Sequence, residues 1–165
     1  KALANIKARC RMIILYHHAA AQHRLVLGTS NKSELLVGYF TKHGDGGADL
    51  EPIGDLYKTE VRGLARLLGI PEKIITKAPS AGLWKGQTDE GEMGITYDRL
   101  DAILLGIEQG LSDDDVVERA GSSTAEVERV RSMVRLSSHK RKFPPAAKIG
   151  LRTPGLDWRE GDEDV

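Results

Sequence analysis

The chain has 165 residues, of which 40% are hydrophobic and 29% are charged. This length and composition are typical of one globular domain. Its formal net charge is zero, so there is no overall attraction to nucleic acid or to an anionic membrane surface. The single cysteine, Cys10, excludes an intrachain disulfide and a multi-cysteine metal site.

Targeting signals are also missing from the sequence. No apolar run approaches the roughly 20 residues that span a bilayer, and no signal peptide is recognisable. We therefore expect a cytoplasmic protein without a membrane partner. The first residue is Lys1, and a helical pattern is already under way there. We expect the chain to begin inside a larger protein.

The first forty residues predict a helix, a strand and a second helix. The first helix should end near Gln22 and bury one face, because apolar residues recur at spacings of three and four at Leu3, Ile6, Cys10, Ile13 and His17. The run from Arg24 to Gly28 is predicted to be a buried parallel strand. After a turn, a helix should run from Lys32 to Phe40. This order favours a layered α/β domain.

The rest of the chain predicts loops and helices. Residues 41–56 should form a loop, followed by a helix over 57–68 that ends at Gly69 and carries Val61, Leu64, Ala65 and Leu68 on one face. Residues 79–94 should be irregular, and a loop of this length is typical of a lid that closes over a substrate. Further helices are predicted at about 96–109, 112–120 and 123–138, with an extended segment from Phe143 onward.

Several separate stretches resemble the NAD synthetase family, in the order in which that family carries them. The most specific is Thr-Lys-His-Gly-Asp-Gly-Gly-Ala-Asp at residues 41–49. The others are Asn5–Arg9, Gly28–Glu34, Gly38–Phe40, Pro52–Lys58, Lys77–Ala81, Asp89–Glu90, Gly94–Asp98 and His139–Arg141. The resemblance covers about residues 2 to 150, and its joint order makes it strong.

The resemblance implies both a fold and a reaction. The fold would be a layered, adenine-nucleotide-hydrolase-like (Rossmann-like) parallel sheet with helices. Residues 1–150 would form the carboxyl-terminal part of one domain, and residues 151–165 an extended acidic tail. The enzyme would adenylate the nicotinate carboxylate of deamido-NAD with ATP and then amidate it with ammonia, as a homodimer that uses Mg²⁺. The family's Ser-Gly-Gly-x-Asp-Ser phosphate loop is absent from these 165 residues, so we expect the chain alone to be inactive.

Glu34 has two competing interpretations. It matches the family's magnesium ligand, and magnesium is commonly held by one or two carboxylates together with phosphate oxygens and water. Asn31 and Glu34 also have the spacing of a helix capping box. Both roles can coexist.

Three residues match positions that contact ATP in the family. They are Thr29, Ser80 and Lys58, and Lys58 is also the candidate catalytic cation. Thr29 and Ser80 flank expected turns, where a hydroxyl often has only a local role. Lys58 stands near a helix start, where the helix dipole disfavours a cation, and this mildly supports a phosphate-binding role.

Five residues match positions that contact deamido-NAD: Arg9, Lys42, Asp49, His139 and Lys140. Arg and Lys suit a pyrophosphate, and Asp can accept hydrogen bonds from ribose hydroxyls. The alternatives are solvated surface charges and, for Asp49, a turn residue.

Two other functions are compatible with parts of the sequence. Residues 112–136 could form a helix-turn-helix that docks in a DNA groove. However, the first helix opens with Asp113, Asp114 and Asp115, which would repel phosphates, so we expect no nucleic-acid partner. The nearer alternative is another amide-forming ligase that cleaves ATP to AMP and pyrophosphate.

Overall fold

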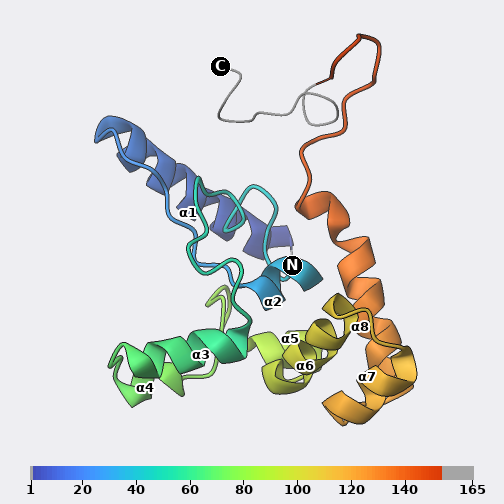
Figure 1. The fold of residues 1–165 in the computed structure, drawn as a ribbon. Helices are drawn as coiled ribbons and strands as arrows, with labels where there is room; N and C mark the ends of the chain where they lie inside the picture. Colours follow the sequence, from blue (N-terminus) through green and yellow to red (C-terminus); the bar gives the residue numbers. More distant parts are fainter. Residues whose placement is uncertain (1, 154–165) are drawn as a thin grey trace.

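The computed structural model describes residues 2–153, and most of its regular structure is helical (Figure 1). The longest helices are α1 (Ala2–Ala21), α6 (Tyr97–Glu108) and α8 (Thr124–Leu136). The others are α2 (Lys32–Val37), α3 (Lys58–Leu67), α4 (Glu72–Ile75), α5 (Asp89–Met93), α7 (Asp113–Ala120) and the 3₁₀ turn η1 (Ser138–Lys140). No helix within this range has the length and hydropathy of a membrane span.

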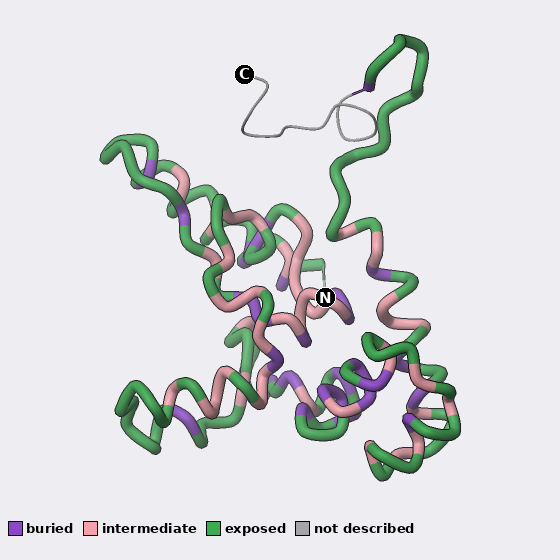
Figure 2. The backbone as a smooth tube through the Cα atoms, viewed as in Figure 1, coloured by how far each residue is buried: buried purple, intermediate pink, exposed green. Residues whose placement is uncertain are grey.

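The hydrophobic core lies where α2, α6, α7 and α8 meet. Tyr97, Leu100 and Ile103 of α6 are completely buried, and Val127 and Val130 of α8 pack against them. Burial of each such aliphatic side chain contributes roughly 1.5–3 kcal/mol. Figure 2 shows that buried positions concentrate in this helical cluster. The core therefore fixes α2, which carries the cavity residue Glu34, and α6, whose Tyr97 donates a hydrogen bond to Glu34.

The three carboxyl-terminal helices begin and end close to where the sequence predicts. Ser112 and Ser123 cap α7 and α8 by accepting hydrogen bonds from Asp115 N and Glu126 N. Gly121 ends α7 in the left-handed conformation, with φ of 57°. The helices predicted near 96–109, 112–120 and 123–138 are thus confirmed, with ends that differ by one or two residues.

The predicted strand over 24–28 forms only a single parallel bridge. Leu27 pairs with Leu50; Gly28 N donates to Leu50 O over 2.8 Å, and Asp49 N donates to Val26 O over 2.9 Å. The prediction that this strand is buried is wrong for the described residues, because Leu25 and Leu27 are 71% and 59% exposed. No described segment covers these side chains, and the turns that follow Leu50 end the pairing.

The inward face predicted for the first helix is also wrong. The large residues at positions 3, 6 and 13 are exposed, whereas the small Ala4, Ala8 and Ala19 are buried. The reason is close contact with the glycine-rich loop of residues 41–47. A side chain added at Gly44 would meet the Ala8 methyl group at 3.0 Å. Small residues on both sides allow this approach.

Helix α3 has no fully buried residue, and Leu68, on its predicted apolar face, is 69% exposed. Two further predictions need correction. The stretch predicted to be irregular over 79–94 contains α5, which Thr88 caps and Gly94 ends. The helix predicted to reach Phe40 ends at Val37, because Gly38 adopts a φ of 72°. The short helix α4 was not predicted.

Gly38 combines a left-handed backbone with tight packing, so Gly38→Ala should destabilise the complete protein by about 2 kcal/mol. A methyl group there would lie 2.2 Å from Ser137 Cβ, at the end of α8. The measurement is urea unfolding of the two proteins.

Gly121→Ala is the matched control, because its φ is +57° but nothing lies within 4 Å of an added methyl group. Gly121→Ala should lower the free energy of unfolding only through the strain of a left-handed backbone, by about 1 kcal/mol. Equal losses in the two variants would show that packing at Ser137 does not matter.

Candidate active site

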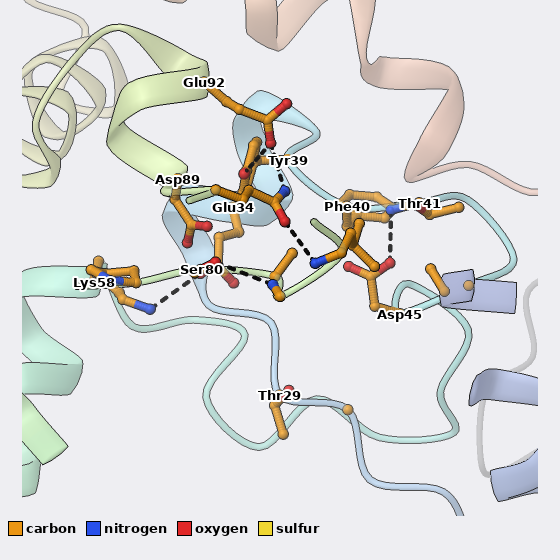
Figure 3. Close-up of a pocket in the computed structure, with 18 of the residues that line it drawn as sticks. Thr29, Glu34, Tyr39, Phe40, Thr41, Asp45, Lys58, Ser80, Asp89 and Glu92 are labelled. Atoms are coloured by element: carbon orange, nitrogen blue, oxygen red, sulfur yellow. Dashed lines mark hydrogen bonds and ion pairs between the residues drawn. The ribbon is translucent and has the colours of Figure 1, made fainter. Parts of the chain in front are cut away.

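A cavity of about 1170 Å³ opens between α1, α2, α3, α5 and the loops that join them. The segment 26–29 lines it, and so do the glycine-rich loop and residues 77–84. Figure 3 shows its polar residues at close range. A cavity of this size can hold a large organic ligand.

The predicted ATP and magnesium residues meet at this one cavity. Thr29, Glu34, Lys58 and Ser80 all line it, although they come from four separate segments. Lys58 points toward Glu34, whereas Thr29 lies apart on the segment after the parallel bridge (Figure 3). Ser80 Oγ accepts a hydrogen bond from Gly82 N over 3.1 Å, as in the turn that the sequence allowed.

The two carboxylate oxygens of Glu34 have different partners. Oε2 accepts from Asn31 N over 3.2 Å, and Glu34 N donates to Asn31 Oδ1, so the predicted capping box is present. Oε1 accepts from Lys58 Nζ over 3.2 Å and from the Tyr97 hydroxyl over 3.2 Å. Oε2 thus caps the helix, while Oε1 belongs to a polar cluster with Lys58 and Tyr97.

Tyr97 links Glu34 to a second carboxylate, Asp89. Its hydroxyl also lies 3.1 Å from Asp89 Oδ2, and Asp89 is 5% exposed. Burial raises the pKa of Asp89 above its usual value, and the nearby Glu34 raises it further. Burial and both carboxylates also raise the pKa of Tyr97, so its hydroxyl keeps its proton. Asp89 Oδ1 has no hydrogen-bond partner within the described chain.

A buried carboxylate holds the starts of α2 and α3 together. Asp101, on α6, accepts from the Ser33 hydroxyl and, over 2.9 Å, from Thr59 N. Ser33 Oγ in turn accepts from Lys58 N over 2.9 Å. Burial raises the pKa of Asp101, whereas the bonds from Ser33 and Thr59 lower it. This network fixes the backbone positions from which Glu34 and Lys58 extend.

Three of the five candidate deamido-NAD residues form a chain of contacts near the glycine-rich loop. Arg9 Nη2 donates to Lys42 O over 3.2 Å, and Lys42 Nζ donates to His139 O over 2.9 Å. Lys140 donates to Gly38 O and Phe40 O over 2.6 and 2.7 Å. Of these candidates only Lys140 lines the cavity.

Asp49 supports the parallel bridge. Its carboxylate accepts from Val26 N over 2.7 Å and from the Tyr16 hydroxyl over 3.0 Å. Asp49 is not among the residues that line the cavity.

The segment between Pro79 and α5 is a closed loop that rests on α1. Asp89 N donates to Pro79 O over 3.0 Å at its base. Lys7 Nζ donates to Leu83 O over 2.7 Å, and Arg11 Nη1 donates to Ala81 O over 3.2 Å. Loops of this shape, with ends in contact, are frequently functional.

Sequence patterns assign no role to Asp89, Tyr97 or Asp101. Asp89 and Tyr97 stand within stretches that resemble the family, which was the available signal. Asp101 carried no signal, because its partners Ser33 and Thr59 are distant in sequence. Residues 2–153 contain no group of three or more side chains arranged to hold a metal ion.

Comparisons with known proteins identify the family of this chain. A family model described as NAD synthase matches residues 1–144. The NH(3)-dependent NAD(+) synthetases of Archaeoglobus fulgidus and Methanosarcina acetivorans are 58% and 52% identical over 146 and 145 residues. Each match covers 88% of this chain but only 56% and 57% of the relative.

Solved structures give the same result. NMN synthetase from Francisella tularensis matches with a TM-score of 0.74 and 41% identity, over 88% of this chain and 56% of its own. An NH3-dependent NAD synthetase from Campylobacter jejuni, in complex with the nitrate ion, matches with a TM-score of 0.70 and 32% identity, over 89% and 55%. The chain thus spans somewhat over half the length of these relatives, and it belongs to the NAD synthase family.

Proposed function

We propose that this chain is part of an ammonia-dependent NAD synthetase. The enzyme joins the nicotinate carboxylate of deamido-NAD to the α-phosphorus of ATP and releases pyrophosphate. Ammonia then displaces AMP and leaves the amide of NAD. The observation that carries the proposal is the meeting of Thr29, Glu34, Lys58 and Ser80 at one cavity. The relatives named NH(3)-dependent NAD(+) synthetase support it.

The polar cluster suits the adenylation step. Lys58 supplies a positive charge near the phosphates of ATP, where negative charge gathers as the adenylyl group is transferred. Tyr97 holds Glu34 and Asp89 beside each other through one hydroxyl group. One lysine balances only one of these two neighbouring carboxylates, so the site favours a bound cation.

Magnesium fits this donor set. Glu34 and Asp89 offer carboxylate oxygens, which magnesium prefers, and Asp89 Oδ1 is buried without a hydrogen-bond partner among residues 2–153. When bound, the ion would neutralise charge on the phosphates. The remaining ligands would be phosphate oxygens and water.

The second step needs a site that keeps water from the adenylate. The loop over residues 79–88 is suited to this task, because it rests on α1 beside the cavity. The pyrophosphate group of deamido-NAD would be bound by Lys140, Lys42 and Arg9. Further contacts to this substrate would come from His139 and Asp49.

The proposal extends to the whole protein. The bridge between Leu27 and Leu50 would belong to a parallel sheet in a layered, adenine-nucleotide-hydrolase-like domain. Residues 1–150 would form the carboxyl-terminal part of that domain. The acidic tail proposed for 151–165 falls mostly outside the described residues. We propose a cytoplasmic homodimer, and no activity from these 165 residues alone, because the sequence lacks the phosphate loop.

The complete protein should convert deamido-NAD, ATP and ammonium into NAD, AMP and pyrophosphate. Chromatography of the products tests this, and ADP in place of AMP would contradict the adenylate mechanism. Because one structural relative is named NMN synthetase, nicotinate mononucleotide should be assayed in parallel. Turnover of that substrate alone would favour the alternative of another ATP-cleaving amide ligase.

A nucleic-acid-binding function has little support. In the proposed helix-turn-helix, Arg131 Nη2 donates to Asp113 Oδ1 over 2.7 Å, and Val127 and Val130 are buried against α6. The basic groups that would contact phosphates are thus partly neutralised within the helix pair.

A further inference from the structure

Arg62 is a cavity residue to which neither the family resemblance nor the proposed function gives a role. It stands on α3 four residues after Lys58, so both side chains leave the same face of the helix. Both line the cavity. Its side chain is 25% exposed, which makes it half-buried.

Arg62 and Lys58 lie against the same aromatic ring. Lys58 Nζ lies 5.2 Å from the centroid of the Tyr97 ring, and the guanidinium carbon of Arg62 lies 5.9 Å from it. The Tyr97 side chain is fully buried and packed in the hydrophobic core. Contact with the ring holds both cations in place, because the face of an aromatic ring attracts positive charge.

The two cations differ in how far carboxylates compensate their charge. Lys58 donates to Glu34 over 3.2 Å, and both side chains are largely buried. The ion pair of Arg62 is with Asp98, at 3.8 Å, and the Asp98 side chain is 80% exposed. A long pair with a solvated carboxylate is weak. No described residue accepts a hydrogen bond from Arg62, so its donors are available to a ligand.

The other cations that line the cavity are less suited to binding an anionic ligand. Arg11 donates to the carbonyl groups of Ala81 and Gly82, and Lys140 donates to two carbonyl groups of residues 38–40. Lys77 is exposed, and its side chain makes no hydrogen bond or ion pair within residues 2–153. Arg62 alone combines partial burial, ring contact and free donors among the cations that line the cavity within residues 2–153.

We infer that Arg62 binds the polyphosphate of ATP beside Lys58, at the part that leaves as pyrophosphate. The inference rests on the proposed function and adds a binding residue to it. A planar guanidinium group can donate two parallel hydrogen bonds to one phosphate, and it stays charged at every relevant pH. A bond forms between a nicotinate carboxylate oxygen and the α-phosphorus. The bond from that phosphorus to the bridging oxygen breaks, and its electron pair leaves with pyrophosphate. Arg62 stabilises this departing charge and transfers no proton.

The test compares Arg62→Gln with Arg66→Gln in the complete protein. Arg66 stands one turn further along α3, does not line the cavity and pairs with Glu72 at 3.3 Å. Arg62→Gln should raise the KM for ATP about tenfold and leave the KM for deamido-NAD and the melting temperature unchanged. Arg62→Lys should recover part of the loss. Arg66→Gln should behave like the unmodified protein.

Calorimetric titration with magnesium pyrophosphate gives a readout that does not require turnover. Arg62→Gln should weaken pyrophosphate binding about tenfold relative to Arg66→Gln. Equal ATP and pyrophosphate affinities in these two variants of an active enzyme would overturn the inference. The unmodified protein could make no NAD while Arg62→Gln still weakens pyrophosphate binding. In that case the proposed function would fail, whereas the inference that Arg62 binds polyphosphate would stand.

Discussion

Replacing Glu34 with Gln in the complete protein should slow adenylation about a hundredfold, or about 2.7 kcal/mol of barrier. A glutamine can still accept from Asn31 N, so the capping box of α2 should survive. Its amide nitrogen would then face Lys58, which now donates to Oε1. A neutral amide is also a poor ligand for magnesium. Single-turnover kinetics over a range of magnesium concentrations would measure the effect, and high magnesium should partly restore the rate.

Glu126→Gln is a close control for this substitution. Glu126 caps α8 through Oε2, which accepts from Ser123 N over 2.9 Å, and its Oε1 accepts from Arg99 over 3.1 Å. The arrangement matches that of Glu34, but Glu126 does not line the large cavity. Its replacement should leave adenylation unchanged. If Glu34→Gln also left the rate unchanged, Glu34 would be only a capping residue.

Replacing Asp101 with Ala should destabilise the complete protein by about 4 kcal/mol. The substitution leaves the Ser33 hydroxyl and Thr59 N without their acceptor, and each buried unpaired group costs about 1–3 kcal/mol. For a protein of 150–250 residues this corresponds to a fall of roughly 8–16 °C in the melting temperature. Calorimetry measures the shift. Asp101→Asn keeps one acceptor and should lose about half as much.

Asp98→Ala is the control on the same helix. The Asp98 side chain is 80% exposed, and its pair with Arg62 is long, so the loss should stay below about 1 kcal/mol. Similar losses at positions 98 and 101 would contradict the view that Asp101 organises the starts of α2 and α3.

The helices were predictable wherever local signals agreed with packing. Ser112, Gly121 and Ser123 mark the ends of α7 and α8 in the sequence, and the structure uses them as caps. Periodicity failed for α1, because it selects large apolar residues. The face that packs is made of alanines such as Ala8, which meet glycines of a distant loop. Patterns of hydrophobicity do not report contacts between two small residues.

The site was predictable to the extent that it resembles a family. Glu34 and Lys58 were expected at one site, and they form an ion pair at 3.2 Å. The supporting residues were not expected. Asp101 and Ser33 are 68 positions apart, and nothing in either local sequence indicates the other. The weak compensation of the Arg62 charge likewise depends on which carboxylates lie near it in space, and this is not visible in the sequence.

The way in which α1 is attached links its local stability to occupation of the cavity. The helix packs on loops through Ala8 and Met12, outside the core cluster of α2, α6, α7 and α8, and therefore it can open without melting that cluster. Lys7 and Arg11 would release the carbonyl groups of residues 81–83 in the same event. A substrate bound only while this loop is closed would suppress the opening by mass action. Amide protection along α1 would then rise with ligand concentration, whereas protection in α6 would stay constant.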